Sequence, residues 1–149
     1  VPGQRSICTW MTDLRSVNRR PHVATTDDPR HELGRAGERV AEQYLRKQGL
    51  KTLARHFNTP VGELDLVMRD GDTIVFVEVK TRRDRKHAEP EDAVHGAKQR
   101  RLLRAAQWFI HARRWDDPPC RFDVIGVIMP AGASPDIKHS PDAFHPRRR

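Results

Sequence analysis

Apolar residues between positions 32 and 48 recur with the spacing of one face of a helix, and Gly49 follows as a helix-end signal. This pattern predicts a helix over residues 32–48. Three small residues lie within it, namely Gly34, Gly37 and Ala41. They give the predicted helix a side that can approach another element closely.

Strand-like patterns follow this helix. Residues 50–58 alternate loosely between apolar and polar side chains, as a half-buried strand does. The stretch VGELDLVMRDGDTIVFVEVKTRR, at residues 61–83, contains two apolar runs on either side of an Asp-Gly pair. Because Asp-Gly is a strong hairpin signal, this stretch predicts two antiparallel strands joined by a tight turn.

The second half of the chain adds another helix and strand. Residues 91–114 follow a helical stripe, in which Gly96 could separate a short first turn. Residues 121–129 form an apolar run of the kind found in buried strands, which suits a parallel position. Residues 137–144 could add an edge segment. The predicted order is therefore α-β-β-β-α-β, without an internal repeat.

The predicted hairpin has an ionic end far from its turn. With Asp-Gly as the two turn residues, Glu63 would face Glu78 and Asp65 would face Phe76. Lys80 would lie on the same face as Glu78. The other face of the hairpin is predicted to be uniformly apolar, with Leu64, Leu66, Met68, Val75, Val77 and Val79.

This ionic end is a candidate metal site. Asp65 and Glu78 would be diagonal neighbours with Cβ atoms roughly 7 Å apart, and magnesium binds oxygen ligands at about 2.1 Å. Without a cation, clustered carboxylates on a half-buried face would raise their own pKa values. Lys80 would supply a point charge that orients a water or stabilises charge on a phosphate. The alternative is a surface hairpin in which Lys80 pairs with Glu78 or Asp65.

Composition and charge narrow the class of protein. The net charge of +8 indicates a polyanionic partner, but residues 31–130 hold 19 basic and 15 acidic residues, so half of the excess lies in the tails. No apolar run approaches the ~20 residues of a membrane span, and no apolar signal segment follows the basic N-terminus. We therefore expect a cytoplasmic protein with no membrane partner, in which Cys8 and Cys120 are reduced.

The spacing of the ionic residues resembles that of a known nuclease superfamily. Asp65, followed thirteen residues later by Glu78-Val79-Lys80, is similar to the PD-(D/E)XK signature of restriction-endonuclease-like proteins. The match is closer to the YraN-like family of small bacterial proteins, which are predicted endonucleases. The segments that carry it are Gly34-x-x-Gly37-Glu38-x-x-Ala41, Gly62-Glu63-Leu64-Asp65-Leu66, Phe76-Val77-Glu78-Val79-Lys80-Thr81-Arg82, Ala93-Val94 with Lys98 and Arg101, and Arg121-Phe122-Asp123-Val124.

The resemblance implies both a fold and a set of catalytic residues. The fold is α/β, a restriction-endonuclease-like α-β-β-β-α-β core whose mixed sheet is flanked by helices. The activity is metal-dependent phosphodiester hydrolysis, in which Asp65 and Glu78 hold Mg²⁺ or Mn²⁺ and Lys80 lies beside them as a further catalytic residue. Glu38 could join the metal shell, or remain an exposed glutamate paired with an arginine. Glu63 would support the site by a salt bridge, a hydrogen bond or direct ligation.

Further residues are candidates for support and for nucleic-acid binding. Gln99 resembles a glutamine that follows the lysine in some relatives. Lys98 lies near the positive end of the second long helix, where it could approach a phosphate or extend along the edge of the core. The basic loop after the Glu-x-Lys strand could contact backbone phosphates or be merely solvated; its cations are Arg82, Arg83, Arg85 and Lys86.

Two features depart from the family pattern. The family usually has Asn where this chain has His56, and the loop after Lys80 lacks the Phe-Gly pair that relatives commonly carry before its proline. The second departure affects the conformation of the loop and its substrate contacts. Neither changes the residues that would bind the metal. Asp123, also at a family-typical position, is expected to form structural hydrogen bonds.

The leading hypothesis is a Mg²⁺- or Mn²⁺-dependent endonuclease-like protein that acts on DNA, with branched and single-stranded DNA among the candidate substrates. The alternative is a nucleic-acid-binding partner protein that keeps the fold and does not cut on its own. A third class, a purely structural interaction domain, leaves the ionic end of the hairpin unexplained. Residues 31–130 would form the nuclease-like domain, after a mobile basic arm at 1–30 and before an edge segment and basic tail at 131–149. The oligomeric state stays open.

Overall fold

A computed structural model describes residues 5–6, 28–86 and 95–144 of the 149-residue chain. The expectations for residues 1–4, 7–27, 87–94 and 145–149, which include most of the predicted arm and the end of the tail, lie outside the described residues.

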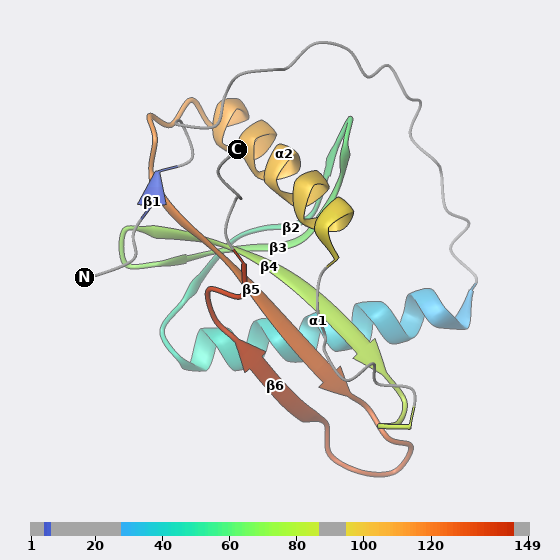
Figure 1. The fold of residues 1–149 in the computed structure, drawn as a ribbon. Helices are drawn as coiled ribbons and strands as arrows, with labels where there is room; N and C mark the ends of the chain where they lie inside the picture. The colour runs from blue at the N-terminus through green and yellow to red at the C-terminus, as the bar shows by residue number, and fades with distance from the viewer. Residues whose placement is uncertain (1–4, 7–27, 87–94, 145–149) are drawn as a thin grey trace.

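The described residues form two helices and six strands (Figure 1). From α1 to β5 their order is the predicted α-β-β-β-α-β, and β6 is the expected edge segment. The elements are β1 (Arg5–Ser6), α1 (Pro29–Lys47), β2 (Lys51–Thr59), β3 (Gly62–Asp70), β4 (Thr73–Arg82), α2 (Gly96–Ala112), β5 (Pro119–Ile128) and β6 (Asp136–Ser140).

All six strands belong to one mixed sheet flanked by helices, which confirms the predicted fold class. The strand order is β1-β5-β4-β3-β2, and β6 also pairs with β5. Strands β2, β3 and β4 are antiparallel neighbours, whereas β4 and β5 are parallel, as the apolar run at 121–129 predicted. Within the described part of the chain, no helix is long and apolar enough to cross a membrane.

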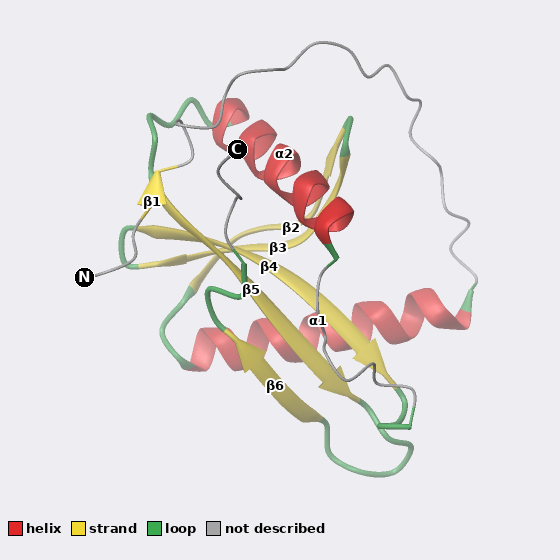
Figure 2. Cartoon of the chain, viewed as in Figure 1, coloured by secondary structure: helices red, strands yellow, loops and turns green. Residues whose placement is uncertain are grey.

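The two helices cover opposite faces of the sheet (Figure 2). Helix α1 begins at Pro29, earlier than predicted, because the Asp28 side chain accepts a hydrogen bond from the Arg30 backbone N–H at 2.9 Å and caps the helix. On its face of the sheet, α1 packs Ala41 and Leu45 against apolar side chains of β3, β4 and β5. On the other face, α2 packs an apolar stripe of Leu102, Ala105, Ala106 and Phe109.

The register of the β3–β4 hairpin differs from the prediction. Asp70 pairs with Thr73, so the two turn residues are Gly71 and Asp72 and the turn begins one residue later. Gly71 has a φ of 58°, in the left-handed region that glycine adopts without steric cost, which favours it as the first turn residue. The predicted pairing of Asp65 with Phe76 is therefore wrong, because Phe76 pairs with Val67.

Strands β3 and β4 separate at their far end. Leu66–Val77 is the last pair that joins them, and beyond it the tip of the β2–β3 hairpin rises beside α2 while β4 continues along β5 (Figure 1). Leu64 packs in the core under α2, whereas Leu66 packs in the core under α1. Residues two apart in a regular strand share a face, so β3 twists at Asp65. The prediction of one uniformly apolar face is thus wrong at Leu64. We call the place where β3 and β4 separate, next to Asp65, the fork.

Helix α1 lies very close to the end of β4. A Cβ atom built on Gly37 would overlap the Oγ1 atom of Thr81, whereas one built on Gly34 would meet nothing within 4 Å. The close approach predicted for the small-residue side of this helix therefore occurs at Gly37. Because Glu38 is the next residue, this close contact also sets where its carboxylate lies.

Gly37→Ala tests this contact. We expect it to lower the free energy of unfolding by about 1–3 kcal/mol, the usual cost of overpacking, because Thr81 or the helix must move. Gly34→Ala is the matched control on the same helix and should raise stability by about 0.5–1 kcal/mol, since it only restricts the unfolded chain. Urea denaturation measures both, and a stabilising Gly37→Ala would contradict the close packing.

Candidate active site

The ionic end of the hairpin lies at the fork. Continuing the β3–β4 register one residue beyond Leu66–Val77 brings Asp65 across from Glu78. Here the backbone N–H of Val79 donates to Oδ2 of Asp65, at 3.0 Å. The aspartate side chain therefore takes the place of a backbone acceptor, which satisfies the N–H where the two strands separate and fixes the carboxylate in the fork.

Glu78 is held from the α2 side. It is only 5% exposed, and its carboxylate forms an ion pair with the ammonium of Lys98, in the first turn of α2. A buried carboxylate needs such a partner, because leaving it unpaired in the interior is costly. The phosphate contact predicted for Lys98 stays a prediction. In this structure the Lys98 charge is directed at Glu78.

The ring of His56 contacts two more carboxylates near the fork. Its Nε2 lies 2.9 Å from Oε2 of Glu38, on α1, and its Nδ1 lies 3.1 Å from Oε1 of Glu63, on β3. Glu63 pairs across the sheet with Asn58 and does not face Glu78, so that part of the predicted register is wrong. The Glu38 contact is close but poorly aligned, since Glu38 Oε2 is buried without a hydrogen-bond partner in the described residues.

His56 occupies an unusual backbone position. The β2–β3 register pairs Arg55 with Leu66 and Phe57 with Leu64, so His56 lies across from Asp65. Its φ is 46°, in the left-handed region where Asn, Asp and His are enriched among residues other than glycine. The Asn that the resemblance led us to expect here would suit the same conformation. The departure at His56 is therefore compatible with the local fold.

The carboxylates at the fork perturb one another. Burial, together with the nearby Glu78 and Glu38 carboxylates, raises the pKa of Asp65 to about 8, although the hydrogen bond from the Val79 N–H opposes the shift. Burial also raises the pKa of Glu38, against the lowering effect of His56. The mutual repulsion expected from the sequence is thus present. A cation placed among these groups would relieve it.

The donor set can be compared with the needs of a metal ion. Across residues 28–86 and 95–144, no three His, Cys, Asp or Glu side chains are arranged to hold one as they stand. The chemistry of the donors nevertheless suits a hard divalent cation, since they are carboxylate oxygens and Glu38 Oε2 is buried without a well-aligned hydrogen bond from any described residue. By their chemistry these carboxylates would suit Mg²⁺ or Mn²⁺ if Lys98 moved away from Glu78.

The remaining predicted residues lie around this centre. Lys80 is half-buried on β4, two residues beyond Glu78, and Gln99 is half-buried next to Lys98. In the basic loop, Arg85 forms an ion pair with Asp136 of β6. Arg82 is half-buried, and its Nε has no hydrogen-bond partner among the described residues; Arg83 and Lys86 are exposed.

Asp123 has the structural role expected for it. It is fully buried on β5 and accepts hydrogen bonds from Arg121 Nε at 3.0 Å and from the backbone N–H of Asp142 at 3.0 Å. Its other oxygen lies 2.8 Å from Nε2 of His139, on β6. These contacts tie β6 and the turn after it to the centre of the sheet.

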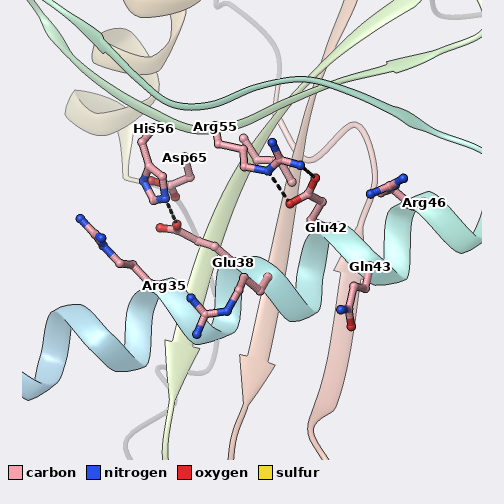
Figure 3. A pocket seen from close by; sticks show the side chains of 10 residues that line it. Arg35, Glu38, Glu42, Gln43, Arg46, Arg55, His56 and Asp65 are labelled. Carbon is pink, nitrogen blue, oxygen red and sulfur yellow. Dashed lines mark hydrogen bonds and ion pairs between the residues drawn. The ribbon is translucent and has the colours of Figure 1, made fainter.

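A pocket of about 430 Å³ opens beside Glu38 and Asp65, between α1 and β2 (Figure 3). Four arginines line it: Arg35, Arg39 and Arg46 from α1, and Arg55 from β2. The arginines of α1 were not among the site residues predicted from the sequence. Their spacing of four and seven residues, close to whole helical turns, is the signal that could have found them.

Comparison with known proteins identifies the family. Residues 37–127 match the family described as "Uncharacterised protein family UPF0102", a span of more than half the chain that includes every carboxylate at the fork. The chain belongs to this family. UPF0102 is the YraN-like group, so the resemblance seen in the sequence is confirmed.

Relatives in the family are similar over most of their length. The UPF0102 protein of Syntrophotalea carbinolica is 53% identical over 112 residues, which is 75% of this chain and 90% of the relative. That of Stutzerimonas stutzeri is 45% identical over 74% of this chain and 92% of its own. That of Geotalea daltonii is 41% identical over 75% and 88%.

The raised pKa of Asp65 makes metal-free stability depend on pH. The folded protein binds this proton more tightly than the unfolded chain, so the stabilisation is complete below about pH 4 and is lost as pH rises towards about 8. We expect Asp65→Asn to remove much of this loss, because the amide keeps an acceptor for Val79 without a charge. Urea denaturation in chelator, at pH 5 and pH 8, gives the free energy of unfolding of both proteins. Relative to the wild type, the variant should be more stable at pH 8 than at pH 5.

Asp116→Asn provides the control, because Asp116 is exposed on the connection between α2 and β5. It should follow the wild type at both pH values. If the free energy of unfolding of Asp65→Asn changes between pH 5 and pH 8 by the same amount as that of the wild type, ionising Asp65 does not destabilise the folded protein. That result would contradict its raised pKa.

Proposed function

We propose that the protein is a divalent-metal-dependent nuclease that hydrolyses phosphodiester bonds in DNA. The observation that carries this proposal is the Asp65 carboxyl, held in the fork by Val79 N–H and placed across from Glu78. This arrangement lies on a mixed sheet with the element order of the restriction-endonuclease-like core. Family membership supports the same proposal through the YraN-like group.

Each residue at the fork has a proposed role. Asp65 and Glu78 would hold Mg²⁺ or Mn²⁺, with Glu38 as a further oxygen donor. Such an ion polarises a phosphate and makes a bound water more acidic. Lys80, next but one to Glu78 on β4, orients the nucleophile or stabilises charge on the phosphate. Glu63 positions His56 and so supports the site.

Lys98 must release Glu78 before that carboxylate can bind a cation. Its side chain is 44% exposed, so it has room to turn towards solvent. Once released, its ammonium is available for a phosphate of the substrate, which was its predicted role. Gln99 would support the site from the same turn of α2.

The alternative is a nucleic-acid-binding protein that does not cut on its own. The Lys98–Glu78 ion pair favours it, since it places a positive charge on a carboxylate that the nuclease needs as a ligand. The absence of a preformed three-ligand set in the described residues favours it too.

Cleavage assays distinguish the two functions. Linear, flapped, forked and four-way DNA would be incubated with the protein, with and without Mg²⁺ or Mn²⁺. We expect metal-dependent cutting of at least one substrate, reduced at least about 100-fold by Asp65→Ala or Lys80→Ala. Binding of the DNA panel without cutting of any member would establish the alternative.

Metal binding can be measured separately through stability. Metal should stabilise the fold by about 2.7 kcal/mol at a hundredfold excess over its dissociation constant. Asp65→Ala should lose this gain, and its stability in chelator should stay close to that of the wild type, because the removed repulsion offsets the lost hydrogen bond from Val79 N–H. Lys80→Ala should keep the gain, since the lysine does not hold the ion. A loss of several kcal/mol by Asp65→Ala in chelator would identify Asp65 as a structural partner instead.

A further inference from the structure

A row of arginines on α1 runs along the pocket beside the fork. Arg35, Arg39 and Arg46 are exposed, and their spacing places them on one side of the helix. They line the same pocket as Glu38 and Asp65. In Figure 3, Arg35 and Arg46 lie towards opposite ends of the pocket, with the carboxylates between them. We call these three residues the arginine row.

The carboxylates beside this row act on it through space but do not hold its guanidinium groups in ion pairs or hydrogen bonds within the described residues. Arg35 has a lowering effect on the pKa of Glu38, and Arg46 on that of Glu42. Glu38 and Glu42 are the acids that lie among the three. Glu38 is contacted by His56, and Arg55 already pairs with Glu42 through two contacts of 2.8 and 2.5 Å. The Thr52 hydroxyl donates a third hydrogen bond to Glu42, at 2.6 Å. Within the described residues, no hydrogen bond or ion pair joins the arginine row to an acid.

The spacing of the row fits a chain of phosphates. From Arg35 to Arg46 the helix rises about 16 Å, so an extended strand that lies along it would present more than one phosphate to the row. One guanidinium group can donate two parallel hydrogen bonds to two oxygens of a phosphate, which makes arginine well suited to bind a phosphate backbone. A strand lying along the row would pass Glu38 and Asp65, where its phosphodiester could react.

The loop after β4 is less suited to be the main contact. Arg85 is tied to Asp136, and Arg82 is half-buried. Of the four cations of this loop that were predicted to bind phosphate, one is therefore held in an ion pair and one is half-buried. The arginine row, by contrast, is exposed along its whole length.

We propose that the arginine row binds the phosphate backbone of a DNA strand and guides it into the Asp65–Glu78 fork. This inference rests on the proposed function and names the path of its substrate. It places the principal backbone contact on α1 rather than on the loop that follows β4.

Binding without cleavage tests the proposal. Fluorescence anisotropy of a labelled single-stranded oligodeoxynucleotide, in chelator and at several salt concentrations, gives the affinity and its salt dependence. Each phosphate contact on a single strand contributes about 0.7 to the slope of log affinity against log salt. Replacing Arg35, Arg39 and Arg46 with Gln should therefore reduce the slope by about two, with a clear loss of affinity at low salt.

The matched control removes the same charge elsewhere. Arg69, Arg104 and Arg114 are exposed and do not line the pocket. Their replacement by Gln should leave the slope near that of the wild type, and urea denaturation checks that both triple variants fold. Equal slope losses in the two variants, an unchanged slope in the row variant, or a wild type that does not bind the oligonucleotide would each overturn the proposal.

Cleavage in Mg²⁺ separates this inference from the proposed function. If the row variant shows the expected smaller slope of log affinity against log salt while the wild type cuts no DNA, the arginine row binds DNA as proposed. The proposed hydrolysis is then wrong. If the wild type cuts DNA and the row variant binds and cuts it equally well, the proposed hydrolysis is supported. The proposed role of the arginine row is then wrong.

Discussion

The hydrogen bond from Val79 N–H to the Asp65 carboxylate is the contact on which the site depends. In an uninterrupted hairpin, the backbone of β3 would satisfy that N–H. With a side chain in its place, the two strands can part, and the tip of the β2–β3 hairpin turns towards α2. The fork thereby lets Glu38 approach from one face of the sheet and Glu78 from the other. The consequence is a buried carboxyl with a pKa raised to about 8, where a cation would be stabilising.

Much of the fold follows from short-range patterns, but its register does not. The helical and alternating periods predicted the element order, and the apolar run at 121–129 predicted the parallel strand. Both Asp70-Gly71 and Gly71-Asp72 are acceptable turn pairs, so the sequence alone does not choose between them. The observed turn places Gly71 first, at a φ of 58°. Parity is the same in both registers, so Asp65 and Glu78 still meet although the predicted partners were wrong.

The site was predictable where a motif fixes residue types and unpredictable where tertiary contacts choose partners. Spacing and resemblance brought together Asp65, Glu78 and Glu38, which the structure places around the fork. That a buried Glu78 needs a positive partner also follows from general physics. That the partner is Lys98 depends on how α2 crosses the sheet, and the position of His56 depends on the irregular backbone of β2. Neither feature has a local signal in the sequence.

Charge balance links the fork to the arginine row. The fork holds an excess of carboxylate, which favours cations, whereas the row holds an excess of guanidinium, which favours phosphates. A phosphodiester lying between them would be attracted by the row and repelled by the fork, unless a divalent ion first covers the carboxylates. On the proposed function, metal and strand would therefore strengthen each other's binding, as linkage requires of any such coupling. Lys98 would take part in the exchange, because an ion on Glu78 frees its ammonium for the incoming strand.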